Sequence, residues 1–190
     1  LYISSVSTTR AHLRIRFGES VSEAMSDIGG EKNATNDHIN RDQVINVGFL
    51  SMPEIGPSGF RFARIDVVEP DATVTLYGIQ GIFTYRELEY KGSFESDDEL
   101  LNTIWNTAAY TVHLNMQEYV WDGIKRDRLV WCGDLNQEII SSIYLFGDNT
   151  NITNSLSFLC SETPADKWIN TIPTYSAWWV INLCDYCRLT

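Results

Sequence analysis

The chain has 190 residues, of which 44% are hydrophobic and 21% are charged, values typical of a folded globular protein. Its formal net charge of −11 argues against nucleic acid or an anionic membrane surface as the main partner, because both attract basic proteins. No apolar run is long enough to span a membrane, and a neutral ligand such as a sugar suits this composition.

The first ninety residues are predicted to form β-strands. Apolar and polar residues alternate over residues 12–17, 60–67, 73–77 and 79–85, as in half-buried strands. Turns rich in Gly, Pro and Asp separate these runs, which favours an antiparallel β-sandwich. The polar segment 29–40 is too long for a tight hairpin and is expected to be a loop.

From Ser96 onward the pattern becomes helical. Ser96 as N-cap and Glu99 three residues later match a capping box, and apolar residues then recur at helical spacing to about Asn115. Three further helices are predicted by the same spacing: residues 134–146, residues 149–159 and the segment from Tyr175 onward. Gly147 is a typical helix stop after the first of these.

The predicted fold class is therefore α+β, with a β-sandwich domain over residues 1–92 and a helical domain over residues 93–190. Both ends of the chain interrupt a pattern, so it is expected to be a piece of a longer protein.

The four cysteines predict no metal site. Cys184 and Cys187 form a C-x-x-C pair, but no second pair and no neighbouring histidine complete a zinc site. Their apolar, Trp-rich surroundings favour buried thiols on a helix.

The most informative segment is residues 121–134, WDGIKRDRLVWCGD. It combines two tryptophans with alternating acids and bases: Trp121, Asp122, Lys125, Arg126, Asp127, Arg128, Trp131 and Asp134. Neighbouring charges push the pKa values of carboxyl groups apart, and glycoside hydrolysis needs two carboxyl groups in different protonation states. Tryptophan rings offer flat faces to a sugar. A salt-bridged structural loop is the alternative interpretation of the same residues.

This segment, with residues 92–105 before it and residues 172–180 after it, resembles the bacterial α-L-rhamnosidases of glycoside hydrolase family 78. The resemblance implies a multidomain fragment: the end of a β-sandwich followed by the first helices of an (α/α)6 barrel. It further implies an inverting exo-glycosidase that releases terminal α-L-rhamnose, with a rhamnose-containing carbohydrate as partner and with no cofactor. Calcium in an attached module is possible in such enzymes, but no cluster of ligands in this chain predicts a metal ion.

The resemblance also implies roles for three carboxylates. Asp122 would bind rhamnose hydroxyls, and Asp134 would bind the sugar or tune the acid. Asp127 stands where many members have Glu as the general acid. Because Asp is one methylene shorter, its carboxyl would lie about 1.5 Å further back, unless the pocket is remodelled to suit it.

Other residues complete the implied pocket. Arg126 and Arg128 would order the carboxylates, and Trp131 would form part of the wall. Trp178 or Trp179 would line the same pocket.

The general base of the family is a Glu late in the barrel, and no residue of this chain matches it. Glu118 and Glu138 are further acids, but they lie in another part of the pattern. The 190-residue chain is therefore expected to be inactive alone, and to self-associate through helix faces meant for absent partners.

Two other functions stay open. The β half could be a carbohydrate-binding module, or the protein could be a catalytically lapsed relative, as Asp127 and the missing base suggest. For a bacterial parent the resemblance implies a periplasmic or extracellular location, with the cytoplasm as the alternative.

Overall fold

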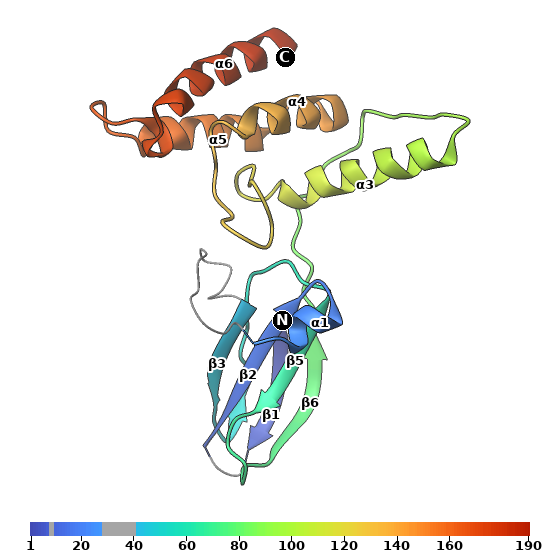
Figure 1. Ribbon diagram of the computed structural model, residues 1–190, viewed down its shortest axis with the longest axis vertical. Helices are drawn as coiled ribbons and strands as arrows, with labels where there is room; N and C mark the ends of the chain where they lie inside the picture. The colour runs from blue at the N-terminus through green and yellow to red at the C-terminus, as the bar shows by residue number, and fades with distance from the viewer. Residues whose placement is uncertain (8–9, 28–40) are drawn as a thin grey trace. The chain divides into compact units, whose positions relative to one another are not determined.

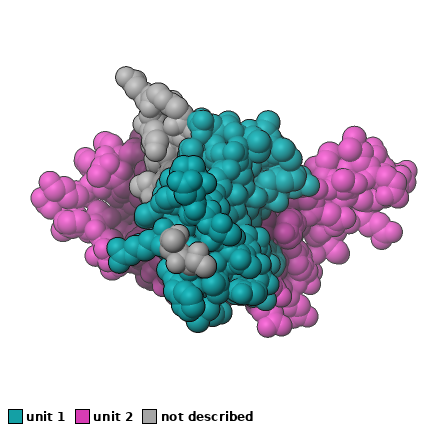
Figure 2. Space-filling model, turned by 90° about the horizontal axis from the view of Figure 1, so that it is seen from below, with its two compact units in different colours: residues 1–84, 125–127 teal, residues 85–124, 128–190 magenta. Residues whose placement is uncertain are grey.

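The structure is a computed structural model that describes residues 1–7, 10–27 and 41–190. The chain divides into two compact units, residues 1–84 with 125–127 (unit 1) and residues 85–124 with 128–190 (unit 2), which Figure 2 distinguishes by colour. The polar segment 29–40 lies outside the described residues. The rest of both units is almost fully described.

Unit 1 is built from two antiparallel sheets and one short helix (Figure 1). Its elements are β1 (Tyr2–Ser7), β2 (Ala11–Gly18), α1 (Val21–Met25), β3 (Asp42–Val47), β4 (Leu50–Ser51), β5 (Phe62–Val67) and β6 (Val74–Gln80). The strand order is β4-β1-β6 in one sheet and β3-β2-β5 in the other. The predicted antiparallel sandwich is therefore confirmed.

The alternation along β2 explains the core of unit 1. Leu13, Ile15 and Phe17 are almost fully buried, and they pack with Ile3 of β1 and Val47 of β3. Because side chains on a strand alternate between its two faces, these residues share the face that is shielded from water.

One predicted strand does not form. Residues 79–85 were expected to be a separate strand, whereas β6 runs continuously from Val74 to Gln80 and no strand follows it before α3. The pairing of β6 with β1 ends at Tyr2 opposite Gln80. Beyond Gln80 the alternating residues have no neighbouring strand, so the pattern alone does not give a strand there.

Unit 2 consists of helices joined by long connections. They are α3 (Glu99–Asn115), α4 (Leu135–Phe146), α5 (Thr150–Ser161), the 3₁₀ turn η1 (Ile169–Thr171) and α6 (Pro173–Leu189). Helix α4 packs against α3 and α6 (Figure 1). Leu135, Ile139, Ile152 and Leu156 form the centre of a core to which the 116–134 connection also contributes.

The helix predictions are confirmed with two corrections at the ends. The predicted stop at Gly147 is present, with φ 75°. The N-cap of α3 is Asp98 rather than Ser96, because the Asp98 side chain accepts the Leu100 N–H while the Ser96 hydroxyl accepts the Asp98 N–H. Helix α6 begins at Pro173, two residues before the predicted start, since proline fits the first turn.

The prediction of buried thiols at Cys184 and Cys187 is wrong. Both lie on α6 and are exposed, since the apolar run that contains them faces several sides of the helix. Among the described residues, no helix is long and apolar enough to cross a membrane.

Candidate active site

The connection between α3 and α4 begins as a closed loop. Met116 and Val120 pair as an antiparallel bridge, and both are buried in the core of unit 2. Asp122 and Leu129 then bond twice: the Asp122 N–H donates to the Leu129 carbonyl oxygen (3.1 Å), and the Leu129 N–H donates to Asp122 Oδ1 (2.9 Å). One carboxylate oxygen of Asp122 therefore helps to close the loop.

Two asparagines from distant parts of the chain fix the end of this connection. Asn170 accepts the Cys132 N–H at Oδ1 (3.0 Å) and donates from Nδ2 to the Val130 carbonyl oxygen (3.1 Å). Asn182 of α6 donates to the Cys132 carbonyl oxygen (2.9 Å). Asn170 has φ 50°, in the left-handed region that asparagine tolerates better than most residues. Residues 130–132 are thus held on both edges.

The thiol at the centre of this arrangement is inert. Cys132 is fully buried, and burial raises the pKa of its thiol to about 11. Because the thiolate is the nucleophilic form, Cys132 contributes packing rather than covalent chemistry.

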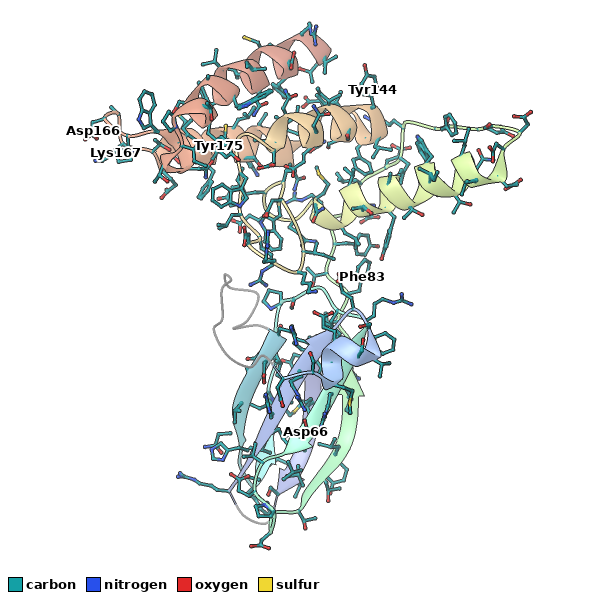
Figure 3. All side chains as sticks on the ribbon, in the orientation of Figure 1. Asp66, Phe83, Tyr144, Asp166, Lys167 and Tyr175 are labelled. Atoms are coloured by element: carbon teal, nitrogen blue, oxygen red, sulfur yellow. The ribbon has the colours of Figure 1, made fainter. Side chains whose placement is uncertain are left out.

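Asp134 lies at the N-terminus of α4 beside two aromatic side chains. Its side chain does not cap the helix; instead Asp134 Oδ2 accepts a hydrogen bond from the Tyr175 hydroxyl (3.2 Å). Trp131 contacts the same tyrosine edge to face, with ring centroids 6.2 Å apart. Burial and the nearby Asp134 raise the pKa of Tyr175, so its hydroxyl remains a donor. Figure 3 labels Tyr175 at the beginning of α6.

Gly133 makes this contact possible. A Cβ atom at Gly133 would lie 2.4 Å from Cε1 of Tyr175, far inside van der Waals contact. The absence of a side chain therefore lets the ring of Tyr175 lie against the backbone between Trp131 and Asp134.

A third carboxyl group joins those of Asp122 and Asp134: Glu138 lies one helical turn after Asp134. Its Oε2 is buried and has no hydrogen-bond partner among the described residues. Burial, together with the negative charges of Asp134 and Asp122, raises the pKa of Glu138 to about 8. Glu138 is therefore a carboxylic acid that stays protonated at neutral pH.

Asp127 is not among the side chains that unit 2 brings together. Residues 125–127 belong to unit 1, where Lys125 Nζ contacts Glu23 Oε1 (2.8 Å) and Glu19 Oε2 (3.1 Å). Asp127 is mostly buried, with φ 55°, and its Oδ1 lies 3.6 Å from Nε of Arg126, whose side chain is 63% exposed. The general-acid role of Asp127 stays a prediction.

The remaining predicted site residues differ in their surroundings. Arg128 is half-buried, and its backbone is in the left-handed region, with φ 52°. Trp179 packs against the core of unit 2 and donates its indole N–H to the Leu156 carbonyl oxygen (3.0 Å). Trp178, also on α6, is 36% exposed.

Sequence reasoning did not find Tyr175, Asn170 or Asn182, and it set Glu138 aside. A signal for Tyr175 exists, because α4 and α5 have 12 residues each. When α5 runs antiparallel to α4 and has the same length, the chain returns to the end of the pair where α4 begins, and α6 starts there. The asparagines carry no such signal.

One hollow of unit 2 is a separate feature. A pocket of about 560 Å³ is lined by residues of the 129–130 segment, α5 and the connection to α6, including Phe158, Lys167 and Trp168. None of the predicted site residues lines it. In the described part of the chain, no group of three His, Cys, Asp or Glu side chains is placed to hold a metal ion.

Residues 89–188 match the family described as the bacterial alpha-L-rhamnosidase six-hairpin glycosidase domain. An alpha-L-rhamnosidase from Formosa agariphila is 31% identical over 84 residues, which cover 43% of this chain and 8% of that protein.

Two solved structures share the fold over 98% of this chain. One is a rhamnosidase from Klebsiella oxytoca with rhamnose bound, with a TM-score of 0.79, 21% identity and 41% of that chain covered. The other is the family GH78 rhamnosidase of Bacillus sp. GL1, with a TM-score of 0.70, 20% identity and 20% of that chain covered. The chain thus spans less than half the length of each of these proteins.

Proposed function

Because the chain belongs to the bacterial alpha-L-rhamnosidase family with a six-hairpin glycosidase domain, we propose that it forms part of an inverting exo-glycosidase that releases terminal α-L-rhamnose. The observation that carries the proposal is the meeting of Trp131, Asp134 and Tyr175 inside the matched residues. A carboxylate between aromatic side chains accepts hydrogen bonds from sugar hydroxyls while the rings cover the apolar face of the sugar.

In this proposal Asp134 and Asp122 hold the rhamnose. The Tyr175 hydroxyl and the Leu129 N–H each donate to one of the two carboxylates and fix its direction. The two carboxylates accept hydrogen bonds from the sugar in these fixed directions. A binding group that is already oriented loses less conformational freedom when the sugar arrives.

Asp127 is the proposed general acid, with Arg126 and Arg128 ordering the carboxylates around it. It would protonate the glycosidic oxygen as the bond to the anomeric carbon breaks, through an oxocarbenium-like transition state. In an inverting enzyme a second carboxylate activates a water molecule on the opposite face, about 6.5–9.5 Å from the acid.

We infer that the second carboxylate comes from outside these 190 residues and that the chain alone does not hydrolyse rhamnosides. The chain spans only 41% and 20% of the two structurally similar rhamnosidases. Helix α3 leaves Leu100, Leu101 and Ile104 between 45% and 65% exposed, as expected of a helix that packs against further barrel helices. The same exposed face supports self-association of the isolated chain.

The general-acid role is tested in a longer protein that contains this chain. Asp127→Asn should lower kcat for an alkyl α-L-rhamnoside by about a hundredfold or more, since general acid catalysis contributes roughly 10²–10⁴-fold. Asp166→Asn is the matched control, because Asp166 is exposed and is not one of the carboxylates of the proposed site. Near-normal hydrolysis by the Asp127→Asn variant would remove Asp127 as the acid, and turnover by the 190-residue chain alone would refute its inactivity.

Binding separates this proposal from a carbohydrate-binding module in unit 1. Rhamnose binding by the 190-residue chain, measured by saturation-transfer NMR, should be lost in Asp134→Ala. Binding that persists when residues 93–190 are removed would instead assign the sugar to unit 1.

A further inference from the structure

Three carboxyl groups lie together in unit 2, and the structure treats them unequally. Asp134 accepts a hydrogen bond from the Tyr175 hydroxyl (3.2 Å), and Asp122 accepts one from the Leu129 N–H (2.9 Å). Glu138 Oε2 is buried and accepts none from any described residue. A donor stabilises the charged form of a carboxyl group, whereas burial without a donor stabilises the neutral form.

Helix geometry makes Glu138 the neighbour of Asp134. The two residues are four positions apart at the start of α4, a spacing at which side chains share one face. The nearby negative charges of Asp134 and Asp122 oppose a further charge on Glu138. No ion pair in the described part of the chain involves Glu138, so no Lys or Arg offsets its burial.

The helices around α4 supply no such cation. From α6, the Tyr175 hydroxyl bonds to Asp134, Asp185 accepts a hydrogen bond from Asn136, and the cation Arg188 pairs with Asp185 (2.9 Å) and not with Glu138. Helix α5 carries no charged residue. The histidine of α3, His113, packs against Phe146 at the opposite end of α4, two helical turns from Glu138.

We propose that Glu138 is a positioning residue that holds one proton beside Asp134 and Asp122 and so adds no third negative charge next to the two carboxylates that bind the sugar. This role rests on the proposed function, and it adds a residue outside the motif of residues 121–134. Of three adjacent carboxyl groups, the one that is buried without a donor takes the proton. The two that are held by donors accept hydrogen bonds from sugar hydroxyls.

This assignment separates Glu138 from the groups that transfer protons to the substrate. A general acid must lose its proton to the leaving oxygen, whereas a positioning residue keeps its proton throughout. Glutamine has the shape of a protonated glutamic acid and cannot ionise. Glu138→Gln should therefore preserve the role, although it would abolish proton transfer.

The first test is carried out on the 190-residue chain and does not depend on activity. The ¹³C signals of the glutamate carboxyl groups are followed by NMR from pH 4 to pH 9, with Glu138→Gln identifying the signal of Glu138. A midpoint near pH 8 is expected for this signal. If Glu138→Gln does not fold, Glu138→Asp identifies the signal by shifting it. A midpoint at the ordinary glutamate value would overturn the proposal, whether or not the protein binds rhamnose.

The second test uses the longer enzyme. Glu138→Gln should keep kcat/KM for an aryl rhamnoside within about threefold at pH 6 and retain activity to higher pH than the unmodified enzyme. A hundredfold loss in Glu138→Gln, or an unchanged pH profile, would contradict the positioning role. A midpoint near pH 8 in a chain that binds no rhamnose would overturn the proposed function alone.

Discussion

Unit 1 and the candidate site of unit 2 use their carboxylates in opposite ways. In unit 1, Asp66 bonds to Arg16 (3.0 Å) and Arg64 (2.8 Å), and Asp42 bonds twice to Arg14. In unit 2, Asp134 at the start of α4 is held by a tyrosine hydroxyl, and Asp122 in the preceding connection by a backbone N–H. Neutral donors orient a carboxylate without neutralising it, so under the proposed function the difference separates charges that stabilise a fold from charges kept for a ligand.

The pKa shifts of the two units follow the same division. Burial by itself raises the pKa of Asp66, but hydrogen bonds from Arg16 and Arg64 outweigh burial and hold this pKa below its usual value. Burial also raises the pKa of Glu138, and there the neighbouring charges are negative and add to the effect. Burial of a carboxyl group therefore has opposite consequences, depending on the sign of its neighbours.

The largest expected effect is the loss of a paired carboxylate in unit 1. Asp66→Ala should destabilise unit 1 by about 3 kcal/mol, because Arg16, with a side chain only 5% exposed, loses one of its partners. Asp134→Ala is the matched change in unit 2 and should alter its stability by less than about 1 kcal/mol, because it removes one hydrogen bond to a tyrosine. Urea unfolding, followed by NMR signals of each unit, measures both. Equal losses in the two units would contradict the comparison.

The pH dependence of stability should differ in sign between the units. The pKa values of Asp66 and Glu23 are lowered in the folded state, so these two groups stabilise unit 1 at pH values above their unfolded-state pKa values. This stability is lost as the pH falls through their folded-state pKa values. The raised pKa of Glu138 acts in the opposite direction. Its contribution to unit 2 is fully present below pH 4.5 and is lost as the pH rises to about 8.

Tryptophan fluorescence can follow this difference, because all six tryptophans of the chain lie in unit 2. The fluorescence-detected melting temperature should fall between pH 5 and pH 8. Glu138→Gln should remove most of this fall, since an amide does not titrate. A fall of the same size in Glu138→Gln would mean that another group is responsible.

The smallest expected effect separates two tyrosines of α6. Tyr175 donates to Asp134 (3.2 Å) in the proposed site, and Tyr186 donates to Asp148 (2.7 Å) away from it. Tyr175→Phe and Tyr186→Phe should each cost about 1 kcal/mol of stability. Only Tyr175→Phe should weaken rhamnose binding, by about threefold to tenfold, in calorimetric titrations. Equal effects on binding would show that Tyr175 does not orient Asp134.

Local signals made α4 predictable, and their limits explain the errors in other elements. Asp134 and Gly147 bound an apolar repeat, and both ends of α4 lie where these residues predict. At α3 two polar residues compete for the cap, and Asp98 replaces Ser96 because its side chain reaches the Leu100 N–H. The strand predicted over residues 79–85 failed because pairing depends on a neighbouring strand, which local alternation does not reveal.

For the candidate site, the sequence indicated the residue types and missed the supports. The motif of residues 121–134 includes Asp122, Trp131 and Asp134, which are half-buried or exposed in unit 2. Asn170 and Asn182 reach the backbone of Cys132 from 38 and 50 residues away. Contacts over such distances depend on how the helices pack, and one sequence contains no signal for them.

The close approach of Gly133 to Tyr175 has a consequence for the history of this family. Any lineage that gains a side chain at position 133 must first reduce or move the ring at position 175, because the two occupy the same space. The two positions should therefore change together or not at all. Substitutions at this pair that occur in a fixed order would mark the branches on which this contact was rebuilt.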